Sequence, residues 1–274
     1  MSDQTTQSTG WQLDRSAPEA YERYLVPAIF VQWADRLLDR SGLERGDRVL
    51  DVGCGTGVVA RRAATRVGEA GSVVGLDLNE GMLATAAQAA SEQALEIEWR
   101  DGEATDLPFA SDGFDVVCCQ QALQFFDYPA AALEEMHRVC EPDGRAVLSV
   151  WRPLGYQPGY VVLAEALERH VGEEAGTMMR SPFPEWDEGD LRTLAREAGV
   201  GGASITIEIG EVRYPSVEEF VRREAASSPL AESITAASRD IRSALVSGVE
   251  DELEAYTDDE GVVFPMETYV LTLR

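Results

Sequence analysis

The sequence contains no lysine, only two histidines and four cysteines, and no apolar run of about 18 residues. Without such a run, no segment is long enough to cross a membrane as a helix. The cysteines, Cys54, Cys118, Cys119 and Cys140, form no C-x-x-C pair, so we expect buried reduced thiols and no metal site or disulfide framework. The polar N-terminus lacks the layout of a signal peptide, and we therefore expect a cytoplasmic protein.

The balance of charge is strongly acidic, because 23 basic residues, all arginine, face 49 Asp and Glu residues, for a formal net charge of −26. Dense carboxylate without lysine is typical of proteins adapted to molar salt, which screens charges within about 3 Å. A GC-rich genome would explain the arginines but not the excess of carboxylates. Such a surface repels nucleic acid at ordinary salt, so we expect a small-molecule partner, with no nucleic acid and no membrane. Nothing in the sequence indicates an oligomeric state.

Strand and helix patterns alternate between residues 48 and 151. A helix over 17–41, ended by Gly42, precedes this region. Five short apolar runs follow, separated by helical stretches at about 57–67, 80–93 and 129–139. The runs are "RVLDVG", "SVVGLDL", "LEIEWR", "FDVVCC" and "GRAVLSVW". Apolar strands that alternate with helices predict a parallel sheet covered on both faces.

After Trp151 this alternation stops. Residues 152–200 are mostly helical, and 204–212 alternate as a strand. Ser216 followed by Glu219 predicts the start of another helix, and helical sequence continues to about 256. The segment "GVVFPMETYVLTLR" predicts a final strand, in which Pro265 indicates a bulge or an interrupted ladder.

A glycine-rich turn lies between the first strand and the helix that follows it. Gly53, Gly55 and Gly57 in "VLDVGCGTGVVARRAA" allow a tight turn and close approach of a ligand to a helix N-terminus. The similar dinucleotide fingerprint is G-x-G-x-x-G, but Val58 stands where its third glycine would fall. The spacing therefore favours a different nucleoside ligand.

From about Val49 to Val150 the sequence resembles the class I S-adenosylmethionine-dependent methyltransferases, in particular the ubiquinone/menaquinone-biosynthesis-like branch. The resemblance rests on four segments in register: "LDVGCGTG", "VVGLDLNEGML", "GEATDLPFASDGFDVV" and "EEMHRVCEPDGRAVLSV". It implies S-adenosylmethionine as the cofactor.

Site residues on the nucleoside side follow from this resemblance. Asp77 ends the second strand, where an acid can accept hydrogen bonds from two ribose hydroxyls, although an aspartate there can also cap a helix. Glu103 corresponds to the acid that receives the adenine amino group, where the family usually has aspartate, and Asp101 competes for that role. The remaining candidates are Ala104, through its N–H, and Leu78 and Met82, which would sandwich the adenine or else belong to the core.

Three further residues are expected near the methionine part of the cofactor. Asp51 would reach the ammonium group or brace the glycine turn, and Gln120 follows the fourth strand at the position that meets the methionine moiety. Tyr24, on a helix that folds over the cofactor in related enzymes, would contact the sulfonium through its ring. For Tyr21 we favour a place in the helix core.

Methyl transfer from a sulfonium is an in-line displacement, which alignment of the reactants and exclusion of water accelerate. No residue stands out as a general base: we interpret His137 as structural, and for Arg180 we favour a salt bridge over contact with an acceptor. Two alternatives remain open, a nicotinamide-dependent oxidoreductase and a non-catalytic nucleoside-binding protein.

The predicted fold is α/β: a Rossmann-like, seven-stranded, mostly parallel sheet with helices on both faces and a helical cap. The resemblance implies that the last strand inserts antiparallel between the fifth and sixth. We divide the chain into an N-terminal capping segment (1–45), a cofactor-binding core (46–151), a substrate cap (152–200 and 213–258) and final strands (201–212 and 259–274).

Overall fold

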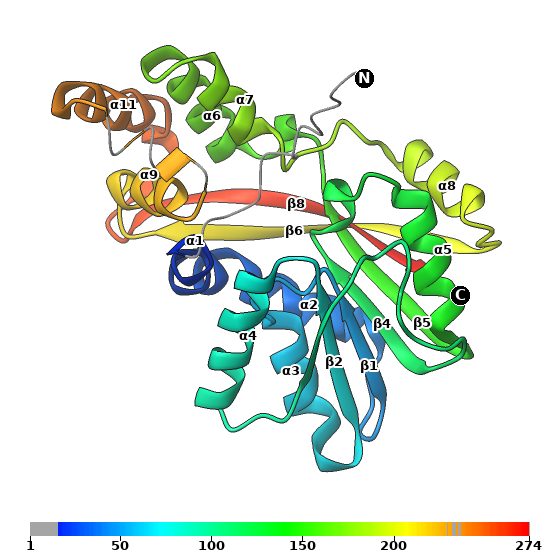
Figure 1. The fold of residues 1–274 in the computed structure, drawn as a ribbon. Coiled ribbons are helices and arrows are strands. Elements are labelled where there is room, and N and C mark those ends of the chain that lie inside the picture. The colour runs from blue at the N-terminus through cyan, green and yellow to red at the C-terminus, as the bar shows by residue number, and fades with distance from the viewer. Residues whose placement is uncertain (1–15, 229, 232–233, 235–236, 274) are drawn as a thin grey trace, which may run out of the picture.

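The computed structural model describes residues 16–228, 230–231, 234 and 237–273. Predictions on residues 1–15 therefore lie outside the described part. One sheet runs through the molecule in the order β3-β2-β1-β4-β5-β8-β6, and a short strand, β7, pairs with β8 (Figure 1). The strands are β1 (Arg48–Val52), β2 (Ser72–Asp77), β3 (Glu98–Asp101), β4 (Phe114–Gln120), β5 (Cys140–Trp151), β6 (Ala203–Tyr214), β7 (Thr257–Asp258) and β8 (Gly261–Leu273).

The predicted topology is confirmed. Strands β1 to β5 are all parallel, and β8 lies antiparallel between β5 and β6. The structure adds the two-residue β7, which the sequence pattern did not indicate.

The expectation of a bulge at Pro265 was wrong, because the register between β6 and β8 is continuous and pairs Glu211 with Pro265. The pairing of β8 with β5 covers only Thr268–Leu273, so Pro265 has no strand on its other side that would need its missing N–H.

Helices cover both faces of the parallel strands. Successive strand residues such as Val116 and Val117, which point to opposite faces, are therefore both buried. Helices α2 (Val31–Ser41) and α3 (Val58–Val67) pack on one face. Helices α5 (Pro129–Val139) and α8 (Glu188–Glu197) pack on the other, and α4 (Glu80–Glu92) lies beside β2 and β3 (Figure 1). The predicted helices of this region are thus confirmed to within a few residues.

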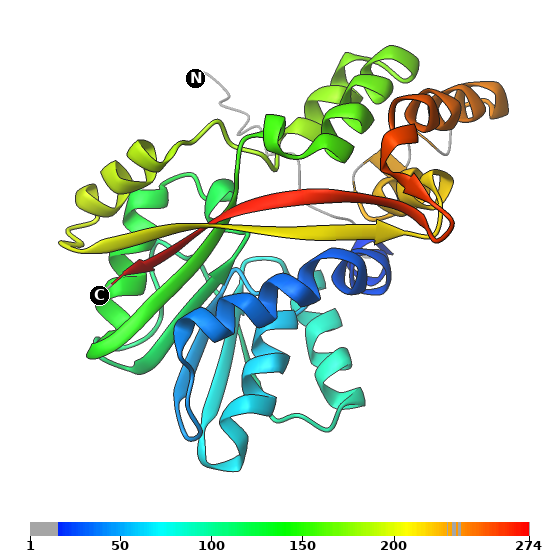
Figure 2. The ribbon, with the colours of Figure 1, turned by 180° about the vertical axis from the view of Figure 1, so that it is seen from behind.

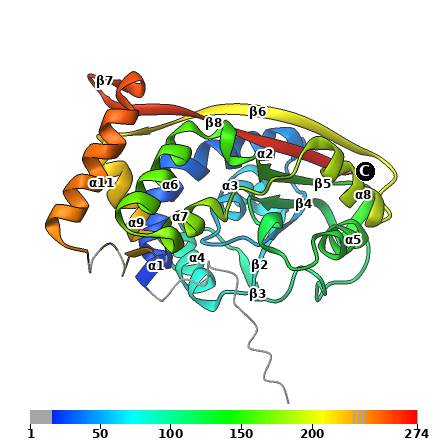
Figure 3. The ribbon, with the colours of Figure 1, turned by 90° about the horizontal axis from the view of Figure 1, so that it is seen from above.

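A second core lies at the other end of the molecule, around α6 (Pro158–His170), α7 (Glu173–Arg180), α9 (Val217–Ala226) and α11 (Arg239–Glu252), which we name the cap helices. Figure 3 shows these helices gathered at one end, with α5 and α8 at the other. Their core includes Trp33 from the N-terminal helices, Trp151 at the end of β5, and Phe264 on β8. Helix α8, within the range that we assigned to the cap, packs against α5 instead.

The N-terminal helix changes its winding along its length. The structure has α1 (Ser16–Ala20), a ten-residue π-helix η1 (Tyr21–Phe30) that contains Pro27, and then α2, which ends at Gly42 with φ +59°. π-Helical turns are uncommon and occur frequently at functional sites. Behind the sheet, this helix runs alongside β6 and β8 (Figure 2). It therefore connects the parallel strands with the cap helices.

Candidate functional site

The candidate site lies at the carboxyl ends of four neighbouring strands. Gly53 follows β1, Asp77 ends β2, and Gln120 ends β4. Asp101, the last residue of β3, pairs with Asp77, so Glu103 lies just beyond the same edge of the sheet. In parallel sheets ligands bind beyond this edge, where the strand order reverses. The topology therefore brings the residues predicted from separate segments to one edge of the sheet.

The glycine turn requires glycine at each of its three positions. Gly53, Gly55 and Gly57 have φ of +66°, +54° and +79°, the left-handed region that other residues rarely adopt. A side chain on Gly53 would lie 2.6 Å from Cβ of Ala122, and one on Gly57 would lie 2.4 Å from the ring of Trp99. Nothing lies within 4 Å of the corresponding point at Gly55. Two glycines thus serve packing, and the third leaves open space beside the turn.

Asp77 fastens this turn to the second strand. Its Oδ2 accepts a hydrogen bond from the Gly55 N–H at 2.7 Å, and its Oδ1 accepts one from the Asn79 N–H at 2.9 Å. The cap of α4 is Asn79, whose side chain accepts from Gly81 and Met82, so the alternative of Asp77 as the helix cap is wrong. Each carboxylate oxygen has a second lone pair, which leaves Asp77 able to accept from two ribose hydroxyls. Burial raises the pKa of Asp77, and its backbone hydrogen bonds oppose that shift.

Asp51 is oriented toward helix α3. It is 1% exposed, and its Oδ2 accepts a hydrogen bond from the Ala60 N–H at 3.0 Å. The N-cap of α3 is Gly57, which has no side chain for this purpose, so Asp51 satisfies one of the free N–H groups of the first turn. We had weighed a contact with the ammonium group against a brace for the glycine turn, and the hydrogen bond from Ala60 corresponds to the brace. Burial raises its pKa to about 7.

The residues predicted to surround adenine differ in exposure. Leu78 is 62% exposed although it is large and apolar, and Met82 on α4 is half-buried. Glu103 is exposed, while Ala104 is buried against the core of the sheet. The exposed side chain of Leu78, directly after Asp77, could cover one face of a flat apolar ligand. The assignment of these four residues to adenine stays a prediction.

Comparison with known proteins agrees with this geometry. The sequence model of a family described as "Methyltransferase domain" matches residues 50–148. The 2-phytyl-1,4-beta-naphthoquinone methyltransferase of Arabidopsis thaliana is 32% identical over 62% of this chain and 70% of its own length. The chain belongs to the class I S-adenosylmethionine-dependent methyltransferases, in the branch with the quinone-biosynthesis enzymes.

Other similarities cover smaller parts or show the fold alone. Nocamycin O-methyltransferase of Saccharothrix syringae is 43% identical over 42% of both chains. The chain spans little more than half of the length of several other curated relatives that it matches, 54–56%. A crystal structure of a putative methyltransferase from Bacillus halodurans superposes with a TM-score of 0.56 at 21% identity, over 88% of this chain and 97% of that one.

The N-terminal helix of this methyltransferase is attached to the cofactor edge at two points. The Gln120 Nε2 donates to the carbonyl oxygen of Phe30 at 3.0 Å. Arg61, which is 5% exposed, donates to Glu22 at 2.6 Å and to the carbonyl oxygen of Thr56 in the glycine turn. Our sequence analysis did not find Glu22 or Arg61, because an ion pair between segments 39 residues apart leaves no local pattern.

The two tyrosines of the π-helix lie in different surroundings, and Tyr21 packs against the core of the cap helices, the place that we favoured for it. The ring of Tyr24 lies 5.1 Å from the guanidinium of Arg222 and 5.8 Å from that of Arg223, both on α9. A hydrogen bond from Arg222 lowers the pKa of Tyr24. Burial and the charges of Glu22, Asp77 and Glu224 raise the pKa of Tyr21. Of these two tyrosines, Tyr21 is the one whose pKa the charge of Asp77 raises. A sulfonium contact of Tyr24 stays a prediction.

Buried polar atoms without partners gather where the methionine part of the cofactor is expected. Within the described residues, Oε1 of Gln120, both amide atoms of Gln124 and Oγ of Ser149 are buried with no hydrogen bond. Gln124 lies in the turn whose residues Ala122 and Phe126 face Gly53. Buried polar groups nearly always have partners, so these atoms fit a polar ligand. Together with the space at Gly55, they fit S-adenosylmethionine.

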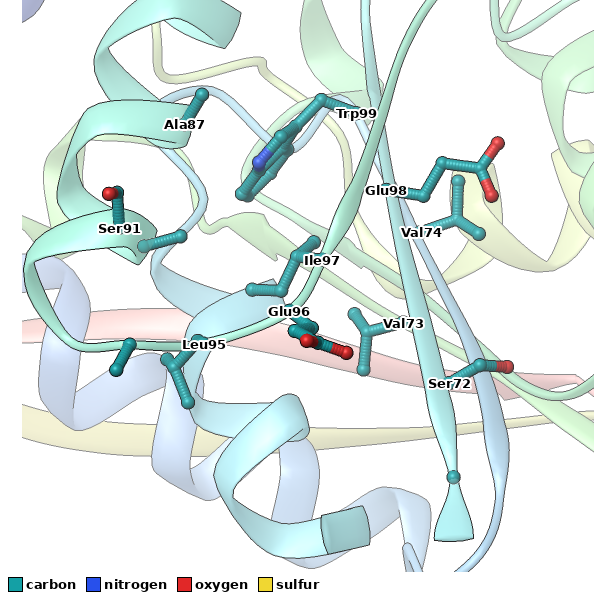
Figure 4. Close-up of a pocket in the computed structure, with 13 residues that line it drawn as sticks. Ser72, Val73, Val74, Ala87, Ser91, Leu95, Glu96, Ile97, Glu98 and Trp99 are labelled. Atoms are coloured by element: carbon teal, nitrogen blue, oxygen red, sulfur yellow. The ribbon is translucent and has the colours of Figure 1, made fainter. Parts of the chain in front are cut away.

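A hollow of about 920 Å³ lies elsewhere, between α4 and strands β2 and β3 (Figure 4). Its walls include Ser72 at the start of β2, Ser91 on α4, and Trp99. Ser72 begins the strand that Asp77 ends, so this hollow lies toward the opposite end of β2. None of the predicted cofactor residues lines it.

Several expectations about other residues can be compared with the structure. All four cysteines are buried and unpaired, as expected. Arg180 forms an ion pair with Glu168 at 2.6 Å, the alternative that we favoured. In the described ranges no cluster of three or more His, Cys, Asp or Glu side chains could hold a metal ion. No described helix is long and apolar enough to cross a membrane.

Proposed function

We propose that this chain transfers the methyl group of S-adenosylmethionine to a small aromatic acceptor that carries hydroxyl groups. The observation that carries the proposal is the contact of Asp77 with Gly55, at 2.7 Å, beside open space at that glycine. An acid held at the end of β2 over a glycine turn is suited to a ribose. The unpaired Oε1 of Gln120 at the end of β4 and the unpaired amide of Gln124 after it are suited to a charged amino acid end.

In this proposal each part of the site has one task. Asp77 holds the ribose, Leu78 and Met82 cover the adenine, and Gln120 meets the methionine end. When bound, S-adenosylmethionine supplies a methyl group on a positively charged sulfur. The chain aligns the acceptor with that methyl group and excludes water, which are the contributions that such a displacement needs most.

The acceptor class is proposed from two considerations. The matched relative from Arabidopsis is named for a naphthoquinone, which is a flat aromatic compound. The cap core of this chain is rich in aromatic side chains, among them Trp151, Tyr160 and Phe183. Such side chains bind flat rings by stacked and edge-on contacts. We therefore propose a hydroquinone or phenol as the acceptor, acted on in a salt-rich cytoplasm.

The test is transfer of labelled methyl from S-adenosylmethionine in low salt and in molar KCl. The acceptors are 1,4-naphthohydroquinone, simple phenols, an amine and a thiol. We expect methylated naphthohydroquinone as a product and no turnover of the amine or thiol. Calorimetry with S-adenosylhomocysteine and NAD checks the cofactor, and tight NAD binding without a signal for S-adenosylhomocysteine would refute the proposal.

A further inference from the structure

A carboxylate is buried in the core formed by the cap helices. Glu224 of α9 is 3% exposed, and its Oε1 accepts hydrogen bonds from the hydroxyls of Tyr160 at 2.7 Å and Tyr214 at 2.8 Å. The described part of the chain provides no hydrogen bond to its other oxygen, Oε2, and no arginine pairs with it. A buried carboxylate without a cation is costly, and apolar residues in its place would cost less. Packing alone therefore does not account for this acid.

A row of aromatic rings connects Glu224 with the cofactor edge. Successive ring centroids lie 5.0 Å apart for Tyr21 and Phe30, 6.4 Å for Phe30 and Trp151, 6.4 Å for Trp151 and Phe183, and 5.1 Å for Phe183 and Tyr160. We call these five residues the aromatic row. Phe30, the second ring of the row, is attached to the end of β4, because Gln120 donates to its carbonyl oxygen. At the far end of the row Tyr160 donates to Glu224.

The N-terminal helices link the part of the fold that holds Asp77 with the part that holds Glu224. The charges of both Asp77 and Glu224 raise the pKa of Tyr21 on η1. The packing agrees, since α1 contacts both α4, which follows Asp77, and α9, which carries Glu224. In Figure 1, α1 lies between α4 and α9. Helix α9, which carries Glu224, is therefore linked to the part of the fold that holds Asp77 through the N-terminal helices.

We propose that the acceptor binds with its ring against the aromatic row and that Glu224 takes the proton of its hydroxyl group. This inference rests on the proposed function and adds to it the general base that our sequence analysis did not find. The ligand class is a neutral, flat aromatic molecule with an ionisable hydroxyl. Aromatic walls suit its ring, and a carboxylate held by two phenolic hydroxyls suits its O–H group.

The step balances with one proton. The O–H bond of the acceptor breaks, the proton moves to the Glu224 carboxylate, and the electron pair stays on the acceptor. That electron-rich acceptor forms a new bond to the methyl carbon, while the carbon–sulfur bond breaks and its electron pair leaves with S-adenosylhomocysteine. Glu224 then releases the proton to solvent, and no oxidant or reductant is needed.

The surroundings of Glu224 suit a base that works near neutral pH. Burial raises its pKa to about 7, against the opposing effect of its two tyrosine partners. The titratable groups that face it are Tyr21, Tyr160 and Tyr214, from η1, α6 and β6. Helix α11 and strand β8 contribute apolar side chains to this core, and the charged residues of α1 and α11 that the structure describes are exposed or half-buried. Arg222 and Arg223 on α9 itself pair with Glu219.

The test uses 1-naphthol, which stays neutral at about pH 5.5 and at about pH 8.5, and the protein saturated with S-adenosylhomocysteine. Calorimetry measures its affinity at both pH values. An ionised carboxylate accepts a stronger hydrogen bond than a protonated one, so we expect the wild type to bind about tenfold more tightly at the higher pH. The midpoint should lie near the pKa of about 7. Glu224→Gln should remove this pH dependence, and Glu218→Gln, an exposed residue of the same helix, should keep it.

A second variant keeps the inference testable if Glu224→Gln does not fold. Tyr214→Phe removes one donor to the carboxylate, so the midpoint of 1-naphthol binding should move to higher pH. In the methylation assay the acidic limb of kcat should move in the same direction. A purely structural role for Glu224 would leave both midpoints in place.

Three results would overturn the inference: no binding of 1-naphthol to the wild type, equal affinity at both pH values, or an unchanged pH dependence in Glu224→Gln. Any of these with intact binding of S-adenosylhomocysteine would leave the cofactor assignment standing. Loss of S-adenosylhomocysteine binding in the wild type would refute the proposed function itself.

Discussion

The parallel strands and the cap place their functional groups in different ways. At the carboxyl edge of the sheet, the functional residues lie at or just past the end of a strand. Gly53 follows β1 and Asp77 ends β2, so the position of each is determined by a few neighbouring residues. In the cap, Glu224 meets Tyr160 from 64 residues away, in a core collected from several distant segments. Local sequence therefore encodes the cofactor edge, whereas only the tertiary fold forms the cap core.

The two regions also hold their buried acids differently. Asp51 is held by a backbone N–H at the start of α3, whereas Glu224 is held by two tyrosine hydroxyls. Burial raises the pKa of both acids to about 7. One acid thus stabilises a helix end, and we assign the other to the acceptor. Variants in each region can separate these roles.

The largest effect is expected for Gly57→Ala, which tests whether the glycine turn serves packing. Gly57 has a φ of +79°, and the Cβ of an alanine there would lie 2.4 Å from the ring of Trp99. The substitution should therefore lower the free energy of unfolding by about 2–4 kcal/mol. Gly55→Ala is the matched control, because φ is also positive but no atom lies nearby. It should cost only about 1 kcal/mol in urea unfolding and yet weaken S-adenosylhomocysteine binding. Equal losses of stability would contradict the distinction between the two glycines.

Asp77→Ala should weaken S-adenosylmethionine binding by about 1.5–3 kcal/mol, or roughly 10-fold to 100-fold, because a charged acceptor is removed from the ribose. The fold should survive, since β2 keeps its pairing with β1 and β3. Calorimetry measures the affinity, and circular dichroism checks the fold. Unchanged affinity would reduce Asp77 to a support for the glycine turn.

The buried acid of the cofactor half should make stability depend on pH. The pKa of Asp51 is about 7 in the folded state, above its value in the unfolded chain, so its contribution is complete at low pH and is lost as pH rises toward 7. Between about pH 5 and about pH 7.5, the wild type should therefore lose on the order of 1–2 kcal/mol more stability than Asp51→Asn. Urea unfolding at the two pH values measures this difference. Parallel losses in both proteins would contradict the raised pKa.

The smallest effect concerns the surface that both regions share. With a net charge of −26, self-repulsion should be relieved as salt increases, so the melting temperature should rise by several degrees from low salt to molar KCl. Exposed ion pairs such as Arg192–Glu188 will weaken over the same range, but each contributes little. A flat or falling melting curve would argue against adaptation to salt.

The parallel strands and the acid at the end of β2 could be predicted from local patterns of apolar runs, glycines and acids. The antiparallel insertion of the last strand was predicted from the resemblance to the methyltransferase family. The sequence was not sufficient for the contacts of the N-terminal helix. The π-helical winding of Tyr21–Phe30 changes which residues share a face, so a periodicity of 3.6 does not predict that the Tyr24 ring lies near Arg222 and Arg223 of α9. Glu224 was also missed, because an acid in an amphipathic helix looks like a solvated residue until its neighbours from other segments are known.

Strands β6 and β8 form a single ribbon that both regions use as a foundation. They pair over twelve residues, from Ala203 with Leu273 to Tyr214 with Val262, while β5 accompanies β8 only as far as Thr268. The ribbon therefore continues beyond the sheet and becomes the floor of the cap, with no loop in this floor that could act as a hinge. To swing open, the cap would have to bend the hydrogen-bonded pair of strands β6 and β8, which is far stiffer than a loop. We therefore expect the acceptor to enter and the product to leave by local shifts of individual helices, while the ribbon keeps its shape throughout turnover.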